Sequence, residues 1–370
     1  GMLSAFGPFV TDMYLPSLPA MADYFSASLP MVQMGLTTSM IGLALGQIFF
    51  GPLSDKYGRR PLLLVSMLLF IVSTLFCLFA PDIYSFVTLR LIQGIAGAGG
   101  IVISRSVAID KFSGKELAKM LAVIGAINGV APVAAPVIGG LLTGSVGWQG
   151  IFMILLFIGI LLGIGCIRFK ESLPAEKRSK TGVWATFRSF GIIVHNRRYM
   201  LYVFQLAFAQ GILFAYIASS PFIIQQHYGF SPFAFSICFA VNAVAIGVAA
   251  ALSVKFRRTE NGTLTGCVGM LVFAVLQMAA LYSGCGFWTY ELLMFALLFM
   301  MGLTFTASTT LAMDCERRYA GAASALLGAL CFASGGIVSP LVGLGDILIS
   351  TGVTFVICAV CSLLCALWAV

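Results

Sequence analysis

Long apolar runs follow one another through the sequence almost without interruption. Each contains about 20 mostly apolar residues, the length that an α-helix needs to cross a lipid bilayer. The runs do not alternate between apolar and polar residues, as the strands of a membrane barrel would. Of the 370 residues, 60% are hydrophobic and 9% are charged, whereas an ordinary soluble domain has about 25% charged residues. We therefore predict an all-α polytopic membrane protein and exclude a water-soluble enzyme, a nucleic-acid-binding module and a disordered chain.

Twelve membrane-spanning helices can be placed on these runs. They lie near residues 1–22, 30–51, 61–80, 83–109, 117–143, 149–168, 199–226, 232–254, 263–283, 289–313, 320–344 and 350–370. A long polar stretch after the sixth run divides the chain. We predict an N-terminal six-helix bundle over residues 1–168, a cytoplasmic linker over 169–198 and a C-terminal six-helix bundle over 199–370. Because the first run begins at Gly1 and reaches Asp12 after only eleven residues, we expect the native N-terminus to be missing.

The positions of the basic residues predict the orientation of the chain. Of the 21 Lys and Arg residues, all except Arg90 and Arg105 follow even-numbered spans. Positively charged loops stay in the cytoplasm, so the loops after odd-numbered spans are external. This asymmetry accounts for the net charge of +8 without a nucleic-acid partner. We expect a multi-pass protein of the bacterial inner membrane whose basic loops face anionic lipid and the cytosol.

Metal and cofactor chemistry finds little support in the sequence. The chain has ten Cys residues, almost all within apolar runs, and two His residues. Buried Cys in such runs is best interpreted as a small hydrophobic residue. No Gly-rich loop ending in Lys and Ser or Thr is present to hold nucleotide phosphates. We expect no cofactor and no metal, and any uphill transport must use an ion gradient.

Two charged residues, Asp12 and Arg90, lie clearly inside predicted spans, where charge costs several kcal/mol and needs a partner, water or a function. Counted from the external ends of their spans at 1.5 Å per residue, they lie at similar depths, roughly 15 Å and 10 Å. They could share one central cavity, either paired with each other or competing for a ligand. We predict that Asp12 carries a proton and that Arg90 tunes it. The alternative is a static pair that only fixes packing.

Further polar and aromatic residues inside the spans are candidate substrate contacts. An amide in a membrane helix more often holds two helices together than binds a ligand, and an aromatic stripe more often faces lipid or core. If these residues line the cavity, they suit a flat, greasy substrate. With Asp12, the predicted substrate-binding residues are Tyr14, Gln93, Asn128, Gln210, Phe214, Tyr216 and Asn242.

The stretch from Gly51 to Pro61, GPLSDKYGRRP, resembles the signature loop between the second and third helices of the major facilitator superfamily. The resemblance implies that Asp55 and Arg59 belong to a cytoplasmic charge cluster that locks one conformation. Gly51 and Gly58 would let the loop turn tightly. Asp110, at the end of the fourth span, is a possible further partner of this conformational lock.

Several other strings resemble the same superfamily. Residues 90–94, RLIQG, resemble its fourth-helix motif, which is tied there to proton coupling. Residues 135–140, APVIGG, resemble its fifth-helix antiporter motif, with Ala135 in place of the usual Gly. Together, TDMYLP at 11–16, ASSPF at 218–222 and AGAASAL at 320–326 resemble the bicyclomycin-resistance and chloramphenicol-resistance group of drug/proton antiporters.

This resemblance implies two six-helix bundles that rock about a central site, and proton-coupled efflux of amphipathic drugs by alternating access. The implied partners are a small-molecule drug, protons and the lipid bilayer, and we expect a monomer. A proton-coupled importer or facilitator of a small metabolite is the alternative. A channel would be suggested by rings of pore-facing charge, a receptor by an exposed ligand domain and an enzyme by a catalytic constellation; none of these is visible in the sequence.

Overall fold

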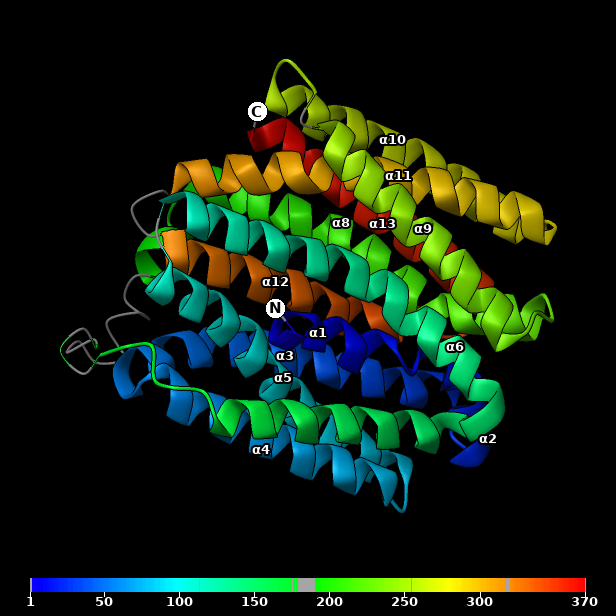
Figure 1. The fold of residues 1–370 in the computed structure, drawn as a ribbon. Helices are drawn as coiled ribbons and strands as arrows, with labels where there is room; N and C mark the ends of the chain where they lie inside the picture. The colour runs from blue at the N-terminus through cyan, green and yellow to red at the C-terminus, as the bar shows by residue number, and fades with distance from the viewer. Residues whose placement is uncertain are drawn as a thin grey trace.

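The computed structural model describes residues 2–112, 114–174, 176, 178, 190–253, 255–316 and 320–369, and every regular element among these residues is helical. Ten of the described helices are long and apolar enough to cross a membrane. This architecture confirms the prediction of an all-α polytopic membrane protein. The long helices run roughly parallel to one another across the molecule (Figure 1). Their bounds are α3 Leu29–Tyr57, α4 Arg59–Leu78, α5 Ile83–Lys111, α6 Gly114–Ile167, α8 Arg197–Phe222, α9 Pro232–Ser253, α10 Thr259–Tyr282, α11 Phe287–Cys315, α12 Ala320–Leu341 and α13 Ile347–Ala369.

The first predicted span is broken into three short helices. Helix α1 covers Met2–Asp12, the 3₁₀-helix η1 covers Leu15–Ser17 and α2 covers Leu18–Tyr24. Pro16 and Pro19 explain the break, because proline lacks the backbone N–H that a continuing helix would use. The chain therefore turns at Met13 and Tyr14, directly after Asp12. The break places this acid at the end of α1, a helix that lies among the other helices in Figure 1.

Helix α6 covers the fifth and sixth predicted spans. Its 54 residues are interrupted at Gly147, where φ is 65° and ψ is −174°. A positive φ is a conformation that glycine adopts readily and most other residues do not. Two spans joined by a sharp turn therefore replace one very long helix, in agreement with the separate runs at 117–143 and 149–168.

Two of the long helices begin at polar caps that the sequence supplies locally. Asp82 accepts a hydrogen bond from the backbone N–H of Ser85 at 2.8 Å, at the start of α5. Asn196 accepts one from Tyr199 at 3.2 Å, at the start of α8. Such caps satisfy N–H groups that have no partner within the helix. They set the starts of two helices that carry candidate site residues.

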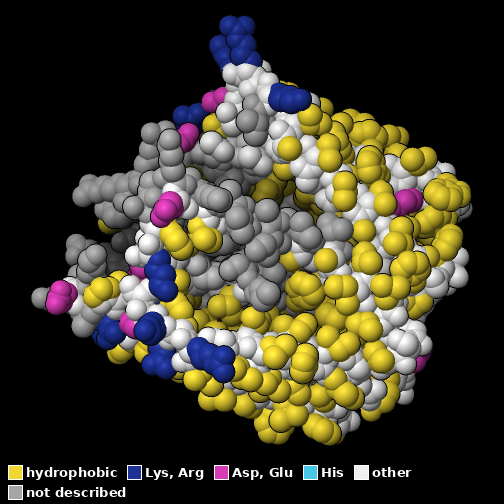
Figure 2. Space-filling view, viewed as in Figure 1, with side chains coloured by type: hydrophobic (Ala, Val, Ile, Leu, Met, Phe, Trp, Pro, Cys, Tyr) yellow, Lys and Arg dark blue, Asp and Glu magenta, His cyan; other side chains and the backbone are white. Residues whose placement is uncertain are grey.

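The described surface is mostly apolar. Large side chains such as Phe79, Trp288 and Trp368 are exposed, and hydrophobic side chains cover most of the right and lower parts of the face in Figure 2. Lys and Arg side chains gather at the left and upper margins of that face. An apolar surface bounded by charge is what a lipid bilayer requires, because lipid offers no hydrogen-bond partners to polar groups.

The two halves of the chain, residues 2–167 and 197–369, touch through several helices. Helix α12 packs on α3, and α6 packs on α9. Among the described residues, three side-chain hydrogen bonds also cross between the halves, all on the predicted external side. They join Gln33 Nε2 to Ala218 O at 3.0 Å, Gln225 Nε2 to Pro16 O at 3.0 Å and Ser236 Oγ to Pro136 O at 2.6 Å. These bonds hold the external ends of the halves together.

Candidate binding pocket

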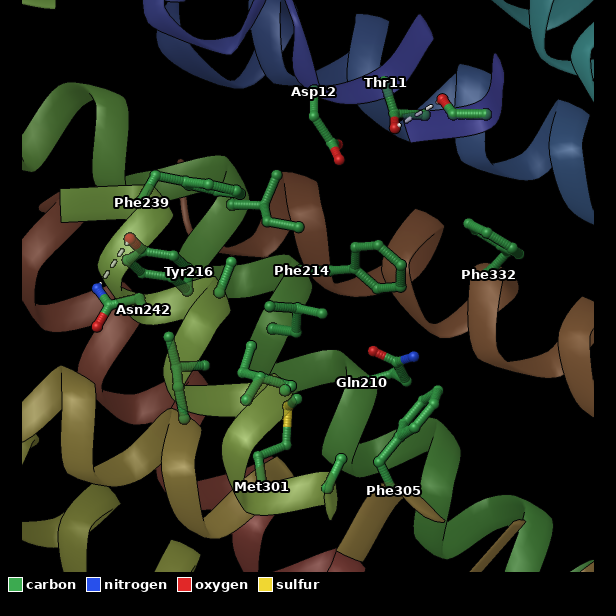
Figure 3. Close-up of a pocket in the computed structure, with 18 of the residues that line it drawn as sticks. Thr11, Asp12, Gln210, Phe214, Tyr216, Phe239, Asn242, Met301, Phe305 and Phe332 are labelled. Atoms are coloured by element: carbon green, nitrogen blue, oxygen red, sulfur yellow. Dashed lines mark hydrogen bonds between the residues drawn. The ribbon is translucent and has the colours of Figure 1, made fainter. Parts of the chain in front are cut away.

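A pocket of about 380 Å³ lies between the two halves. Helices α1, α3 and α5 of the first half and α8, α9, α11 and α12 of the second contribute side chains to its wall. Figure 3 shows the aromatic and aliphatic side chains that converge on this space. A concave, mostly apolar site with a few placed polar groups is the usual form of a small-molecule site.

Asp12 enters this pocket from the end of α1. Its side chain points across the space toward Tyr216 and Phe214 of α8 (Figure 3). The residue is only 6% exposed, so its carboxyl group sits in a largely apolar environment. Among the described residues that line the pocket, Asp12 is the single carboxylic acid, and none is a Lys, Arg or His. The pocket therefore suits neutral or cationic ligands and disfavours anions.

Gly139 of α6 keeps the break after Asp12 in place. A Cβ atom at this position would lie 1.8 Å from the carbonyl oxygen of Met13. Only glycine allows the α6 backbone to approach the turn this closely. Gly139 belongs to the string that resembles an antiporter motif, and here its function is to let α6 pack directly beside the residue that follows Asp12.

Arg90 is fully buried behind the pocket, and its side chain contacts the backbone of α1. Its Nη1 and Nη2 atoms both donate to the carbonyl oxygen of Val10 at 3.1 Å, and its Nε donates to Gly35 O at 3.3 Å. The break frees carbonyl groups in the last turn of α1, and the guanidinium satisfies one of them. The Tyr14 ring lies 4.4 Å from the guanidinium carbon, which is a cation–π distance.

The relation between Arg90 and Asp12 is indirect. Within the described part of the chain, no ion pair joins the two side chains within 4.0 Å. Arg90 instead holds the helix turn that carries Asp12, through Val10 two residues earlier. Neither predicted alternative, a direct pair or two residues sharing the cavity, matches this arrangement, because Arg90 does not line the pocket.

Five of the eight predicted substrate-binding residues meet in the pocket, and two lie behind it. Asp12, Gln210, Phe214, Tyr216 and Asn242 line it. Tyr14 is buried beneath Arg90, and Gln93 donates to Thr74 Oγ1 at 2.7 Å while its other amide atom accepts from Arg90. Both therefore belong to the network behind the pocket. The side chain of Asn128 lies outside the described residues.

The rest of the wall is aromatic and aliphatic. The Phe239 ring stacks on Tyr216 with centroids 5.6 Å apart, and Phe332 lies against Phe214 at 6.0 Å. Met301 completes the surface in Figure 3. Flexible methionine and flat aromatic faces adapt to ligands of different shape. This lining fits a greasy, partly planar small molecule better than a hydrated sugar.

One acid of the binding region was not singled out by the sequence. Glu291 lies within α11, four residues after its first residue Phe287. Its Oε1 atom accepts a hydrogen bond from Asn242 Nδ2 at 2.8 Å. The sequence did hold a signal, since the predicted span 289–313 contains Glu291. Its position near the span boundary made it look like an interfacial residue.

The conformational lock lies at the end of α3. Arg59 bridges two acids: its Nη1 lies 2.5 Å from Asp55 Oδ1, and its Nε donates to Asp110 Oδ2 at 2.9 Å. Ser54 Oγ also accepts from Nη1, at 2.7 Å. The cluster thus ties together α3, α4 and α5. The prediction that Gly51 lets the loop turn was wrong, because Gly51 lies within α3, one turn before Asp55, and has no positive φ.

Gly58 and Glu171 complete this cluster. Gly58 has a φ of 101°, which explains why glycine stands at the turn between α3 and α4. Glu171 reaches in from the linker and accepts hydrogen bonds from the backbone N–H groups of Arg59 at 2.9 Å and Arg60 at 3.0 Å. Partial burial alone would raise the pKa of Glu171, but the backbone hydrogen bonds from Leu173, Arg60 and Arg59 outweigh it and lower the pKa.

Comparison with known proteins places this geometry in context. The sequence-family model described as Major Facilitator Superfamily matches residues 2–340 of this chain. An uncharacterised MFS-type transporter of Bacillus subtilis is 39% identical, over 94% of this chain and 88% of its own length. A bicyclomycin resistance protein homolog of Haemophilus influenzae is 30% identical, over 92% and 87%. A chloramphenicol resistance protein of Pseudomonas aeruginosa is 27% identical, over 75% and 67%.

Solved structures share the fold. A bacterial homolog of the human lysosomal transporter Spinster, in an inward-facing and unoccupied conformation, has a TM-score of 0.78 with 18% identity, over 98% of this chain and 94% of its own. The xylose transporter XylE of E. coli, in a partially occluded inward-open conformation, has a TM-score of 0.75 with 16% identity, over 99% and 95%. At these identities the likeness concerns the fold alone.

Proposed function

Because this chain belongs to the Major Facilitator Superfamily and is a membrane transporter rather than an enzyme, we propose that it exports amphipathic drugs across the bacterial inner membrane in exchange for protons. The observation that carries the proposal is the placement of Asp12, the single carboxylic acid among the described lining residues, in a mostly apolar and aromatic pocket between the two halves. Such an acid can bind a proton or accommodate a ligand. The names of the drug-resistance relatives support the substrate class.

The proposed cycle couples the two ligands through Asp12. With the pocket open to the cytoplasm, a neutral or cationic drug enters beside the ionised acid and packs against Tyr216 and Phe239. The halves then rock, and the pocket opens to the outside. A proton binds Asp12 as the drug leaves, and the protonated carrier returns. Drug and proton need opposite preferences for the ionised acid, which is a thermodynamic coupling between them.

The surrounding residues have supporting functions in this cycle. Arg90 positions the turn that carries Asp12, and it brings a positive charge close to the acid without pairing with it. The hydrogen bonds from Gln33, Gln225 and Ser236 keep the external end closed while the drug is loaded. The lock formed by Asp55, Arg59 and Asp110 biases the equilibrium between conformations. We propose that one copy of the chain performs the whole cycle as a monomer.

A drug-susceptibility panel tests the proposal. The chain is expressed in a bacterial host that lacks its own efflux pumps, and growth is measured with bicyclomycin, chloramphenicol and a set of amphipathic dyes. We expect protection against at least one compound, and loss of that protection when the proton gradient is collapsed. Unchanged susceptibility to every compound, together with proton-dependent uptake of a metabolite, would favour the importer alternative instead.

A further inference from the structure

Glu291 has no partner that would stabilise a permanent charge. Its Oε1 atom accepts the single hydrogen bond from Asn242, while its Oε2 atom is buried without a hydrogen-bond partner among the described residues. No ion pair within the described part of the chain includes it. The titratable groups that face it are neutral ones, Tyr216 of α8, Cys238 of α9 and Tyr290 of its own helix. An ionised carboxylate is costly in such surroundings.

Asn242 connects this acid to the pocket. Its Nδ2 atom donates to Glu291 Oε1 at 2.8 Å and to the Tyr216 hydroxyl at 3.1 Å. Asn242 and Tyr216 both line the pocket, and the second of these hydrogen bonds is visible in Figure 3. One amide group therefore separates Glu291 from the ligand space.

The orientation of the Asn242 amide can depend on whether Glu291 holds a proton. An ionised carboxylate only accepts hydrogen bonds, so it requires the amide nitrogen of Asn242. A protonated carboxyl can donate to the amide oxygen, and Asn242 Oδ1 is buried without a partner among the described residues. Rotation of the Asn242 side chain would satisfy that oxygen and change the hydrogen bond offered to Tyr216. The two protonation states thus correspond to two arrangements of the pocket wall.

We propose that Glu291 is a second proton-binding group of the transport cycle, and that Asn242 transmits its protonation state to Tyr216 in the pocket. This inference rests on the proposed drug/proton exchange. The step forms and breaks only one O–H bond. A proton from water on one side of the membrane binds Glu291, and the same proton is released to water on the other side. The transporter then has one proton-binding acid in each half, Asp12 and Glu291.

Infrared difference spectroscopy of the purified protein in lipid nanodiscs tests this directly and needs no drug. Spectra are recorded from mildly acidic to mildly alkaline pH for the wild type, Glu291→Gln, Asp12→Asn and Glu260→Gln. Glu260 lies in the first turn of α10 and serves as the matched Glu→Gln control in the same half. We expect a carboxylic-acid C=O band that disappears as the pH rises, is absent in Glu291→Gln and is retained in Glu260→Gln.

A second variant keeps the test valid if Glu291→Gln fails to fold. Asn242→Ala keeps the acid and removes its hydrogen-bond donor, so the Glu291 band should remain but shift in frequency. A Glu291→Gln spectrum identical to that of the wild type, or a Glu291 band that does not change with pH, would overturn the proposal. Either result leaves drug/proton exchange standing if Asp12→Asn still abolishes transport. If Asp12→Asn transports normally, the proposed function fails, whatever the Glu291 spectrum shows.

Discussion

Arg90 illustrates how one side chain can shape the pocket without lining it. A planar guanidinium can hold two atoms on one carbonyl oxygen and a third donor on another helix, and a Lys ammonium cannot reproduce this fork. Here the fork joins Val10 of α1, Gly35 of α3 and α5 itself. The positive charge and the geometry are therefore separable by mutation.

We predict that Arg90→Lys lowers stability and export even though it keeps the charge. Leaving buried carbonyl groups without donors costs about 1–3 kcal/mol, and the turn at Asp12 loses its anchor. Thermal unfolding and drug efflux measure the two effects. Arg168→Lys, at an exposed position, is the control and should behave as the wild type. Full activity and unchanged stability of Arg90→Lys would show that charge alone matters at this position.

At the scale of single elements, the close contact between α6 and the broken first span should be sensitive to one methyl group. Gly139→Ala would force a Cβ atom into the Met13 carbonyl oxygen. Overpacking of this kind costs about 1–3 kcal/mol, so we expect a lower melting temperature and impaired export. Gly144→Ala on the same helix has no atom within 4 Å of the new Cβ and should change neither. Equal melting temperatures for the two variants would contradict the packing described above.

The start of α4 should be sensitive to pH through Glu171. Because the pKa of this acid is lowered in the folded protein, its contribution to stability is complete above the ordinary pKa of glutamate and is lost as the pH falls through the lowered value. Glu171→Gln should be less stable than the wild type near neutral pH, by about 1 kcal/mol as for other helix caps. The difference should shrink in acid. A stability difference that stays constant with pH would argue against the cap.

The elements themselves were largely predictable from the sequence, because a bilayer allows few alternatives. Apolar runs of spanning length indicated the helices. The orientation that the distribution of Lys and Arg indicates stays a prediction. The network around Arg90 was not predictable, because a carbonyl group freed by a helix break has no signature of its own. The estimate of the depth of Asp12 treated the first span as one straight helix, although Pro16 and Pro19 indicated a break in it. Glu291 was missed because an acid near a predicted span boundary resembles an interfacial one.

At the scale of the whole molecule, the proposed transport cycle requires two halves that close one end at a time. The end predicted to be external is held by hydrogen bonds across the halves, while the Arg59 cluster ties three helices of the first half to the linker. A charge cluster that must break or re-form when helices move can slow or bias a change of conformation without contacting the ligand. Binding and turnover should therefore respond differently to its loss.

We predict that Arg59→Ala slows turnover but leaves ligand binding intact. The variant removes the shared partner of Asp55 and Asp110, far from the pocket. Equilibrium binding and efflux rate, measured on the same preparation, separate the two effects. Lys56→Ala removes a neighbouring exposed charge and should leave both unchanged. Wild-type turnover in Arg59→Ala would contradict the conformational lock. The motif at residues 51–61 would then indicate only the membrane topology.

The proposed exchange of protons for drug at Asp12 can be measured most directly in inverted membrane vesicles with an acidified interior. The drug with the largest effect in the susceptibility panel is added, and a pH-sensitive dye reports proton release from the vesicles. We predict that the wild type and Asp23→Asn, a matched change at an exposed position, release protons when drug is added. Asp12→Asn should release none, although it reaches the membrane in normal amounts. Drug-dependent proton release by Asp12→Asn at the wild-type rate would contradict the proposed coupling.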